Sequence, residues 1–346
     1  MAYTTIKKPS DYFNTVTYTG TAGEQTISGV GHQPDFIWVK QRGDAGYDHS
    51  LHNSVSGLLK QLISNSTATE ITNTDTITSN NSDGFVLGAD TAGPNANSNN
   101  QDTKNYVAWN WKANGTGVAN TDGSISSTVS ASATSGFSIV KYSGDGGSSS
   151  TVGHGLNAIP KFVTIKCITS TPSWQCWGDG YTRLSLNNPD ADLGSNGMTR
   201  GASTVTLPSG INDWNGSGQD YIMYCWSEVK GFSKFGSYTG NGSTDGTFVY
   251  TGFKPAFVMM KSYSHAVNWK IEDSKRNQPF NDGYGASINA NENSAEDNNT
   301  AYDIDILSNG FKQRNTNSNM NNPGYTYIYM AFAEEPLVGD NPATAR

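Results

Sequence analysis

The run Phe36-Ile37-Trp38-Val39-Lys40 decides the fold, because two further runs of the same kind follow it along the chain. Each run begins shortly after a proline and ends on lysine. Proline lacks an N–H donor, so it suits the start of a strand. The runs show little polar alternation, which predicts strands that are covered on both faces. The two later runs are Phe162-Val163-Thr164-Ile165-Lys166 and Phe257-Val258-Met259-Met260-Lys261.

Two other landmarks keep the same order around each run. A Tyr-x-Gly motif stands 22, 24 and 23 residues before the lysine, and an aromatic strand closes each repeat. Alternate residues of the closing strand are large, and a period of two places them on one face, which we expect to form the core of each module. The ordered set in three places indicates duplication. The motifs are Tyr18-Thr19-Gly20, Tyr142-Ser143-Gly144 and Tyr238-Thr239-Gly240, and the closing strands are residues 106–111, 221–226 and 327–332.

We therefore predict an all-β fold of three tandem β-sandwich modules of the jelly-roll or concanavalin-like kind. Modules 1, 2 and 3 are predicted at residues 1–113, 137–230 and 231–336. Residues 114–136 are rich in Gly, Ser, Thr and Ala, and form either a linker or an edge strand. Residues 337–346 form a polar C-terminal tail. Only Val55–Ile63 has apolar residues at helical spacing, and we expect at most a short helix or a turn there.

Composition limits the possible partners of the chain. The 346 residues carry 15% charged residues and a formal net charge of −8. Nucleic-acid binding needs a basic surface, so we expect no nucleic-acid partner. No apolar run approaches the roughly 20 residues that span a bilayer, so we expect no membrane insertion.

The usual signatures of chemistry are missing from the sequence. His49 and His52 have no third ligand at a recognised zinc spacing. Glycoside hydrolysis needs two carboxylates at a defined separation. Asp303 and Asp305 alternate on a predicted strand and would share a face, and Glu334 and Glu335 lie at the end of module 3. We predict no catalytic residue, no cofactor and no metal site. The three cysteines are predicted to be buried free thiols, and a bridge from Cys225 to Cys167 or Cys176 stays open; all three lie in module 2.

Two sets of residues are candidates for contact with a partner. The repeated lysines Lys40, Lys166 and Lys261 either contact a partner or carboxylate, or are strand-end lysines that protect an edge. Tryptophans in predicted loops of module 2 either stack on sugar rings or fill a module interface. We take these tryptophans as the possible partner or glycan contact: Trp174, Trp177 and Trp214.

Together the landmarks resemble a family of virion structural proteins of tailed phages of marine bacteria, including cyanophages. The resemblance rests on the order of short motifs and extends over nearly the whole chain. It implies a tail- or fibre-associated component of the particle, and it supplies no catalytic residues. The matching segments are Tyr12-Phe13, Tyr18–Gly20, the Gly-x-x-Pro-x-Phe-Ile-Trp-Val-Lys run from Gly31, Ser82–Phe85, Tyr106–Lys112, Ser308–Phe311 and Tyr325–Glu335.

The leading hypothesis is a non-enzymatic structural protein of a tailed-phage virion. It would form a tail-fibre, tail-tip or capsid-surface appendage and contact the host receptor. We expect other virion proteins as partners, a homo-oligomer, contact with a host surface glycan, and synthesis in the host cytoplasm before release by lysis. The alternatives are a carbohydrate-binding module protein and a glycan-degrading enzyme.

Overall fold

The computed structural model describes residues 4–93, 95–208, 211–276 and 285–336. The tail predicted at residues 337–346 lies outside the described residues. The described chain is built of antiparallel sheets, with two short 3-10 helices, η1 (Pro9–Asp11) and η2 (Thr300–Tyr302). The predicted all-β sandwich fold is confirmed.

Three large sheets share one strand order, and we call the parts of the chain that hold them modules 1, 2 and 3. In each of them the closing aromatic strand lies between the opening strand and the apolar run that ends on lysine. Module 1 has the order β1 (Phe13–Thr19), β9 (Asn105–Trp111), β3 (Phe36–Gln41), β4 (Ser50–Asn53), β5 (Lys60–Leu62), β6 (Ile71–Thr72). Module 2 has β10 (Val118–Asn120), β11 (Ser127–Ser132), β12 (Phe137–Ser143), β19 (Asp220–Trp226), β14 (Phe162–Cys167), β15 (Gln175–Gly178), β16 (Tyr181–Ser185). Module 3 has β20 (Ser233–Thr239), β28 (Thr326–Pro336), β22 (Phe253–Ser262), β23 (Lys270–Asp273), β24 (Gly285–Asn289), β25 (Asp297–Asn299).

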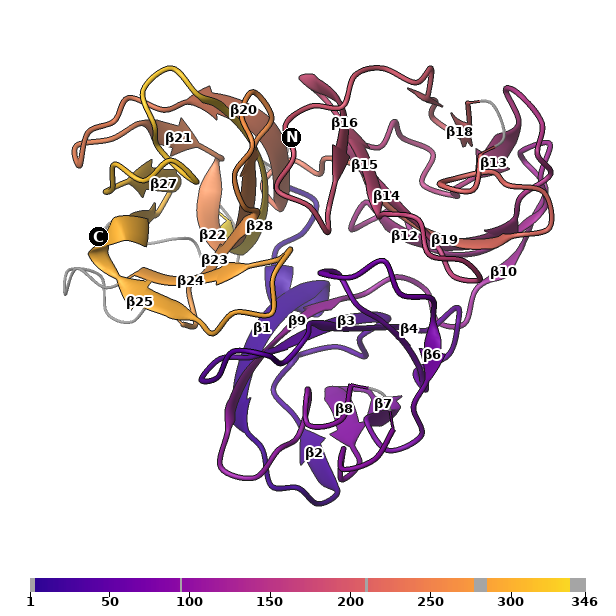
Figure 1. Ribbon diagram of the computed structural model, residues 1–346, viewed down its shortest axis with the longest axis horizontal. Helices are drawn as coiled ribbons and strands as arrows, with labels where there is room; N and C mark the ends of the chain where they lie inside the picture. The colour runs from indigo at the N-terminus through magenta and orange to yellow at the C-terminus, as the bar shows by residue number, and fades with distance from the viewer. Residues whose placement is uncertain (1–3, 94, 209–210, 277–284, 337–346) are drawn as a thin grey trace.

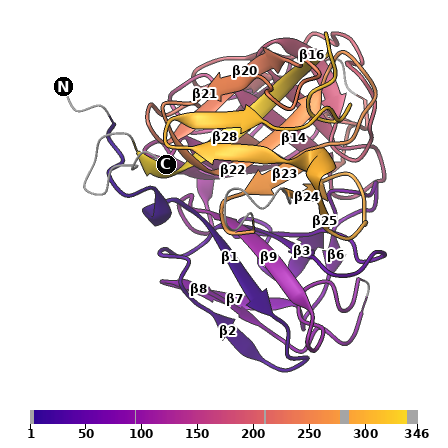
Figure 2. The same ribbon diagram turned by 90° about the vertical axis from the view of Figure 1, so that its left-hand side faces the viewer.

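A three-stranded sheet covers the outer face of each large sheet (Figure 1). In module 1 the layer between the two sheets is apolar and contains Ile37 and Ala108 from the large sheet and Phe85 from the small one. Figure 2 shows β2, β7 and β8 on the side of module 1 that faces away from the other modules. The small sheets are β2 (Gln25–Ile27), β8 (Gly84–Leu87), β7 (Ile77–Asn81); β13 (Thr151–Gly153), β18 (Thr204–Thr206), β17 (Thr199–Arg200); and β21 (Phe248–Tyr250), β27 (Gly310–Gln313), β26 (Ile304–Leu307).

The large residues of the closing strands face the centre of the molecule. Trp111, Trp226 and Phe332 belong to one buried cluster that draws on all three modules. Rings from different modules touch there, with centroids 6.3 Å apart for Trp111 and Trp226 and 5.6 Å for Trp111 and Phe332. The expectation that this face forms the core of each single module is therefore corrected, since the core that it forms is shared between modules.

The tyrosine of each Tyr-x-Gly motif packs against the first tyrosine of the closing strand in the same module. Tyr18 stacks on Tyr106 with ring centroids 5.1 Å apart, and its equivalents in modules 2 and 3 stack at 5.1 and 5.0 Å. The closing-strand tyrosine also donates its hydroxyl to a loop carbonyl, that of Asn97 in module 1. These pairs fix the loops before the closing strands; the equivalents are Tyr142 with Tyr221 and Tyr238 with Tyr327.

The matching Ser-x-Gly-Phe turns of modules 1 and 3 need their glycines. A side chain at Gly84 would overlap the carbonyl oxygen of Ile27, and one at Gly310 would overlap that of Val249. The neighbouring edge strand approaches so closely that only glycine fits.

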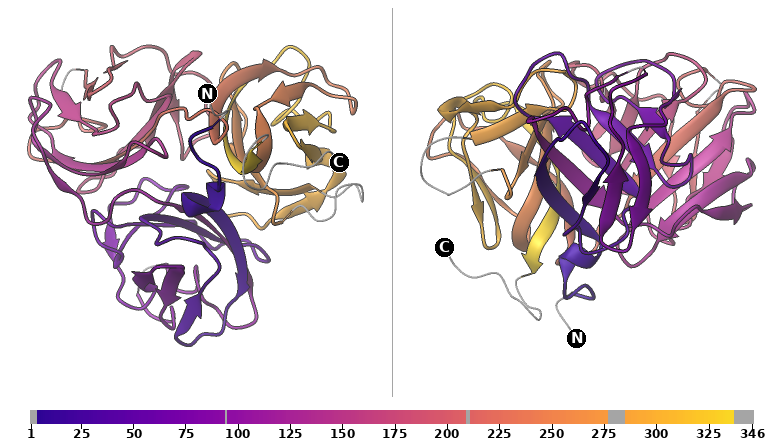
Figure 3. Two further views of the ribbon diagram at one scale, coloured as in Figure 1. Left: turned by 180° about the vertical axis from the view of Figure 1, so that it is seen from behind. Right: turned by 90° about the horizontal axis from the view of Figure 1, so that it is seen from below.

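Residues 114–136 contain β10 and β11, which extend the sheet of module 2 beyond β12. Within Val55–Ile63 the chain forms a turn followed by β5, without a helix. At one end of the molecule η1 lies close to the end of β28 (Figure 3), so modules 1 and 3 meet there.

Candidate functional site

The tryptophans predicted to lie on loops are buried. Trp174 is 0% exposed and donates its indole N–H to the carbonyl of Ile63 in module 1 at 2.9 Å. Trp177 and Trp214 are each 3% exposed and pack edge to face, 5.8 Å apart, inside module 2. Their large apolar areas favour burial. The prediction that these residues contact a glycan is therefore corrected, and Trp174 matches the alternative, a residue that fills a module interface.

Trp174 has one counterpart in each of the other modules, and the three make a cyclic set of contacts. Trp269 donates its indole N–H to the carbonyl of Ser185 in module 2, at 2.9 Å. His49 lies 2.9 Å from the carbonyl of Asn289 in module 3 through Nε2. Trp38 donates to Nδ1 of the same ring at 2.8 Å, so Nε2 carries the proton. Module 1 thus binds module 3, module 3 binds module 2 and module 2 binds module 1, and a head-to-tail contact made three times closes a ring.

Two of the three repeated lysines, Lys166 and Lys261, bind across the same interfaces. Lys40, Lys166 and Lys261 are 0% exposed, and each donates to the carbonyl of the following residue, at 2.8, 2.9 and 2.6 Å. Lys166 also donates to Thr67 of module 1 at 3.0 Å, and Lys261 to Pro189 of module 2 at 3.1 Å. Strands β3, β14 and β22 lie inside their sheets, so the interpretation as edge-protecting lysines is wrong.

Burial changes the acid–base behaviour of these lysines. It lowers the pKa of Lys40 and of Lys166 to about 8 and that of Lys261 to about 7. A low dielectric disfavours the charged form, while the surrounding carbonyl oxygens favour it.

The interface between modules 1 and 3 carries an ion network. Glu296 accepts from Arg42 at 2.8 Å and from Arg276 at 2.9 Å, and Arg276 also donates to Asp273 at 2.6 Å. Asp273 accepts in addition from the indole N–H of Trp109 in module 1, at 2.9 Å. The side chains of Arg276, Asp273 and Glu296 are 0 to 3% exposed. This interface joins the two modules that are farthest apart in the sequence.

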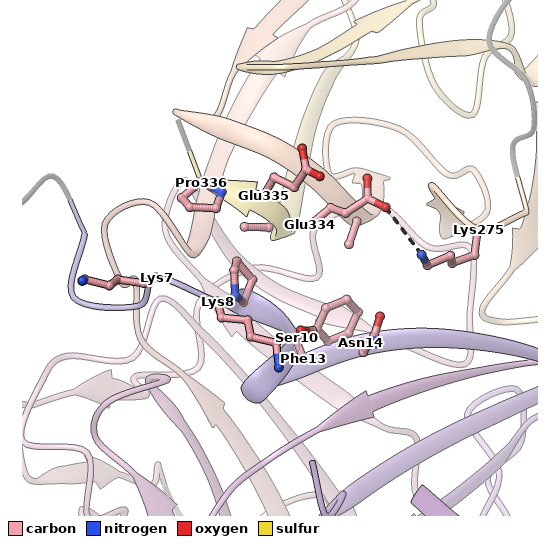
Figure 4. Close-up of a pocket in the computed structure, with 12 residues that line it drawn as sticks. Lys7, Lys8, Ser10, Phe13, Asn14, Lys275, Glu334, Glu335 and Pro336 are labelled. Atoms are coloured by element: carbon pink, nitrogen blue, oxygen red, sulfur yellow. Dashed lines mark ion pairs between the residues drawn. The ribbon is translucent and has the colours of Figure 1, made fainter. Parts of the chain in front are cut away.

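A cavity of about 460 Å³ opens between the first residues of module 1 and the end of β28 (Figure 4). Phe13, Ala256 and Ala333 give it an apolar wall. Its Glu334 lies between Lys254 at 2.8 Å and Lys275 at 3.6 Å. The described residues that line it include no histidine or cysteine, and its Glu334 is held in these ion pairs.

The other candidates from the sequence are also engaged. The ring of His52 contacts the carbonyl of Leu58 and the hydroxyl of Ser50, each at 2.7 Å. Asp305 accepts from Arg314 at 2.6 Å. In the described part of the chain no three His, Cys, Asp or Glu residues gather where they could hold a metal ion. The cysteines are buried free thiols, as predicted.

Two further signals in the sequence repeat in all three modules. The interface residues His49, Trp174 and Trp269 follow the repeated lysine by nine, eight and eight residues. A buried asparagine also stands six residues before the closing-strand tyrosine in every module. Its side-chain oxygen accepts a hydrogen bond from the backbone N–H of the residue after the Tyr-x-Gly motif. In module 1 Asn100 accepts from the N–H of Thr21 at 2.9 Å. The equivalents of Asn100 are Asn215 and Asn321.

Comparison with known proteins places the chain in a family. Over the residues that the structure describes, there is no helix long and apolar enough to cross a membrane. No curated protein matches the chain. One family model, described as Domain of unknown function (DUF7483), matches residues 8–336 and so takes in all three modules. The chain therefore belongs to the DUF7483 family.

Proposed function

We propose that the chain is a non-enzymatic structural protein of a tailed-phage virion, part of a tail fibre, a tail tip or the capsid surface. The observation that supports this most is the use of polar groups between modules. Buried lysines, indole N–H groups and the network around Glu296 all bind neighbouring modules. Such groups stabilise a rigid body that presents its outer surface to partners.

The resemblance of the motif order to virion proteins supports the location. In the proposed role the outer surfaces of the modules contact other virion proteins and the host receptor, and the protein works as an oligomer. The paired state of Glu334 and Asp305 supports a role without catalysis.

Mass spectrometry and immunogold labelling of purified particles test this proposal. We expect the protein at a fixed copy number per particle, with label at one place on the tail or the capsid. Detection in the lysate but not in purified particles would contradict the proposal. The competing enzyme hypothesis predicts hydrolysis of host polysaccharide that is lost in Asp303→Asn or Asp305→Asn, and we expect no such activity.

A further inference from the structure

The small sheet of module 3 carries two exposed aromatic residues on one face. Phe248 and Tyr250 in β21 are 43% and 55% exposed, whereas Val249 between them is 6% exposed and packs inward. Alternate residues of a strand lie about 6.5 Å apart on the same face. The two rings therefore form a short row on the outside of the molecule.

Gly310 of β27 lies next to this row. It pairs with Tyr250 across the strands β21 and β27, and a side chain built on it would come within 3.1 Å of the Phe248 ring. The ring of Phe248 thus extends over the glycine. We call Phe248, Tyr250 and Gly310 the aromatic platform.

Charged side chains that interact with one another border the platform. Lys312, opposite Phe248, forms an ion pair with Asp245 at 2.5 Å. Arg314 pairs with Asp305 at 2.6 Å and with Asp245 at 3.3 Å. Asp303 also acts on the charge of Arg314. Two cations and three anions therefore border the platform, and they offer both hydrogen-bond donors and acceptors.

The other two modules have no such feature at the matching positions. Each small sheet pairs one buried residue of its first strand with a buried residue of the next strand in the sheet. This pairing makes Val249 of β21 equivalent to Ile27 of β2 and to Val152 of β13. The flanking positions are then Thr26 and Ser28 in module 1, and Thr151 and Gly153 in module 2. The repeated fold therefore does not require aromatic residues there, and exposing them to water has no benefit for stability.

We propose that the aromatic platform binds a neutral carbohydrate chain of a cell surface. A sugar ring has a flat face of C–H groups for an aromatic ring and hydroxyls at its rim for the bordering donors and acceptors. Two rings in a row suit two neighbouring sugar units. The border has one more anion than it has cations, which disfavours anionic ligands. As a receptor contact the platform rests on the proposed virion role, but its binding to sugar is a property of the isolated protein.

A protein partner fits the platform less well. Two half-exposed rings offer roughly 200 Å², far below the roughly 800 Å² that each side of a stable protein interface buries. An added β-strand would use the edge of the sheet rather than its face. Module 2 shows that edge pairing needs no aromatic residue, because Ile125 donates its N–H to the carbonyl of Thr151 in β13 at 2.9 Å.

Titration of the purified full chain with neutral glucan, galactan and mannan hexasaccharides, by calorimetry, tests the proposal. We expect binding to at least one of them that does not change with salt concentration. Phe248→Ala and Tyr250→Ala should each weaken it about tenfold without changing the thermal midpoint. Thr26→Ala and Ser28→Ala, at the matching positions of module 1, should leave binding unchanged.

Each other outcome overturns the proposal. These outcomes are no binding to any of the three neutral glycans, or binding that survives both aromatic substitutions. Self-association in analytical ultracentrifugation that both substitutions abolish would instead assign the platform to a second copy of the chain. Analysis of purified particles tests the virion role separately. If the protein binds sugar but is absent from particles, the proposal for the platform stands and the proposed virion role is contradicted.

Discussion

Replacing Lys166 with methionine tests whether the buried lysines hold the modules together. The ammonium donates to the carbonyls of Thr67, Cys167 and Pro172 at 2.9 to 3.0 Å. Hydrogen bonds to a charged group contribute about 1.5–3 kcal/mol each. Burial lowers the pKa of Lys166 from 10.5 to about 8, so the variant recovers about 3 kcal/mol of desolvation. The three bonds, less the recovered desolvation, leave a net loss of about 1.5–6 kcal/mol in the free energy of unfolding, because the carbonyls remain buried without donors.

Urea unfolding at neutral pH, followed by tryptophan fluorescence, measures this loss. Lys161→Met is the matched control, because Lys161 belongs to the same module and forms a half-exposed pair with Asp179 at 2.8 Å. That variant should change stability by less than about 1 kcal/mol. The reasoning is refuted if Lys166→Met unfolds at the same urea concentration as Lys161→Met.

Three further predictions concern the same interfaces and the thiols. Burial lowers the pKa of His49 from 6.5 to about 3. The contribution of His49 to stability is therefore complete above pH 6.5 and is lost as the pH falls towards 3. Between pH 6.5 and 4 the urea midpoint of His49→Gln should fall less than that of the wild type. Glu296→Gln should cost about 3 kcal/mol in the same assay, because the partly buried Arg42 loses its carboxylate partner and the buried Arg276 keeps only Asp273. A loss below about 1 kcal/mol would show that the network does not join modules 1 and 3. Burial raises the pKa of the Cys176 thiol to about 12, and the other two cysteines are equally buried, so a thiol reagent should modify the protein only after unfolding; rapid reaction of the folded protein would contradict this.

The strands could be predicted from sequence, because their signals are local. Proline, an apolar run and a terminal lysine mark β3, β14 and β22, and the period of two marks the closing strands correctly. A period shows which residues share a face, but not what covers that face. The period therefore predicts that Trp111 and Trp109 share a face. The contact of Trp111 with Trp226 instead depends on how distant modules meet.

The candidate site was harder to predict, for a related reason. Trp174 follows Pro172 and Ser173, which suggests an exposed loop, yet a carbonyl of module 1 covers it. Lys166 looks like the end of a strand, yet the neighbouring module supplies an acceptor for it. Both depend on contacts between modules, which the spacing within one module does not reveal. Phe248 and Tyr250 lie on the outer face of the short strand β21, whereas Val249 between them packs inward.

The cyclic contacts through His49, Trp174 and Trp269 have a consequence for assembly. Three separate protomers joined in this way would dissociate on dilution, whereas one polypeptide keeps its parts at a high effective concentration. A single chain also allows the three corners to diverge, which identical subunits cannot do. In the proposed virion role, one copy of the chain would take the place of three separate subunits and would present a single aromatic platform away from the centre of the ring.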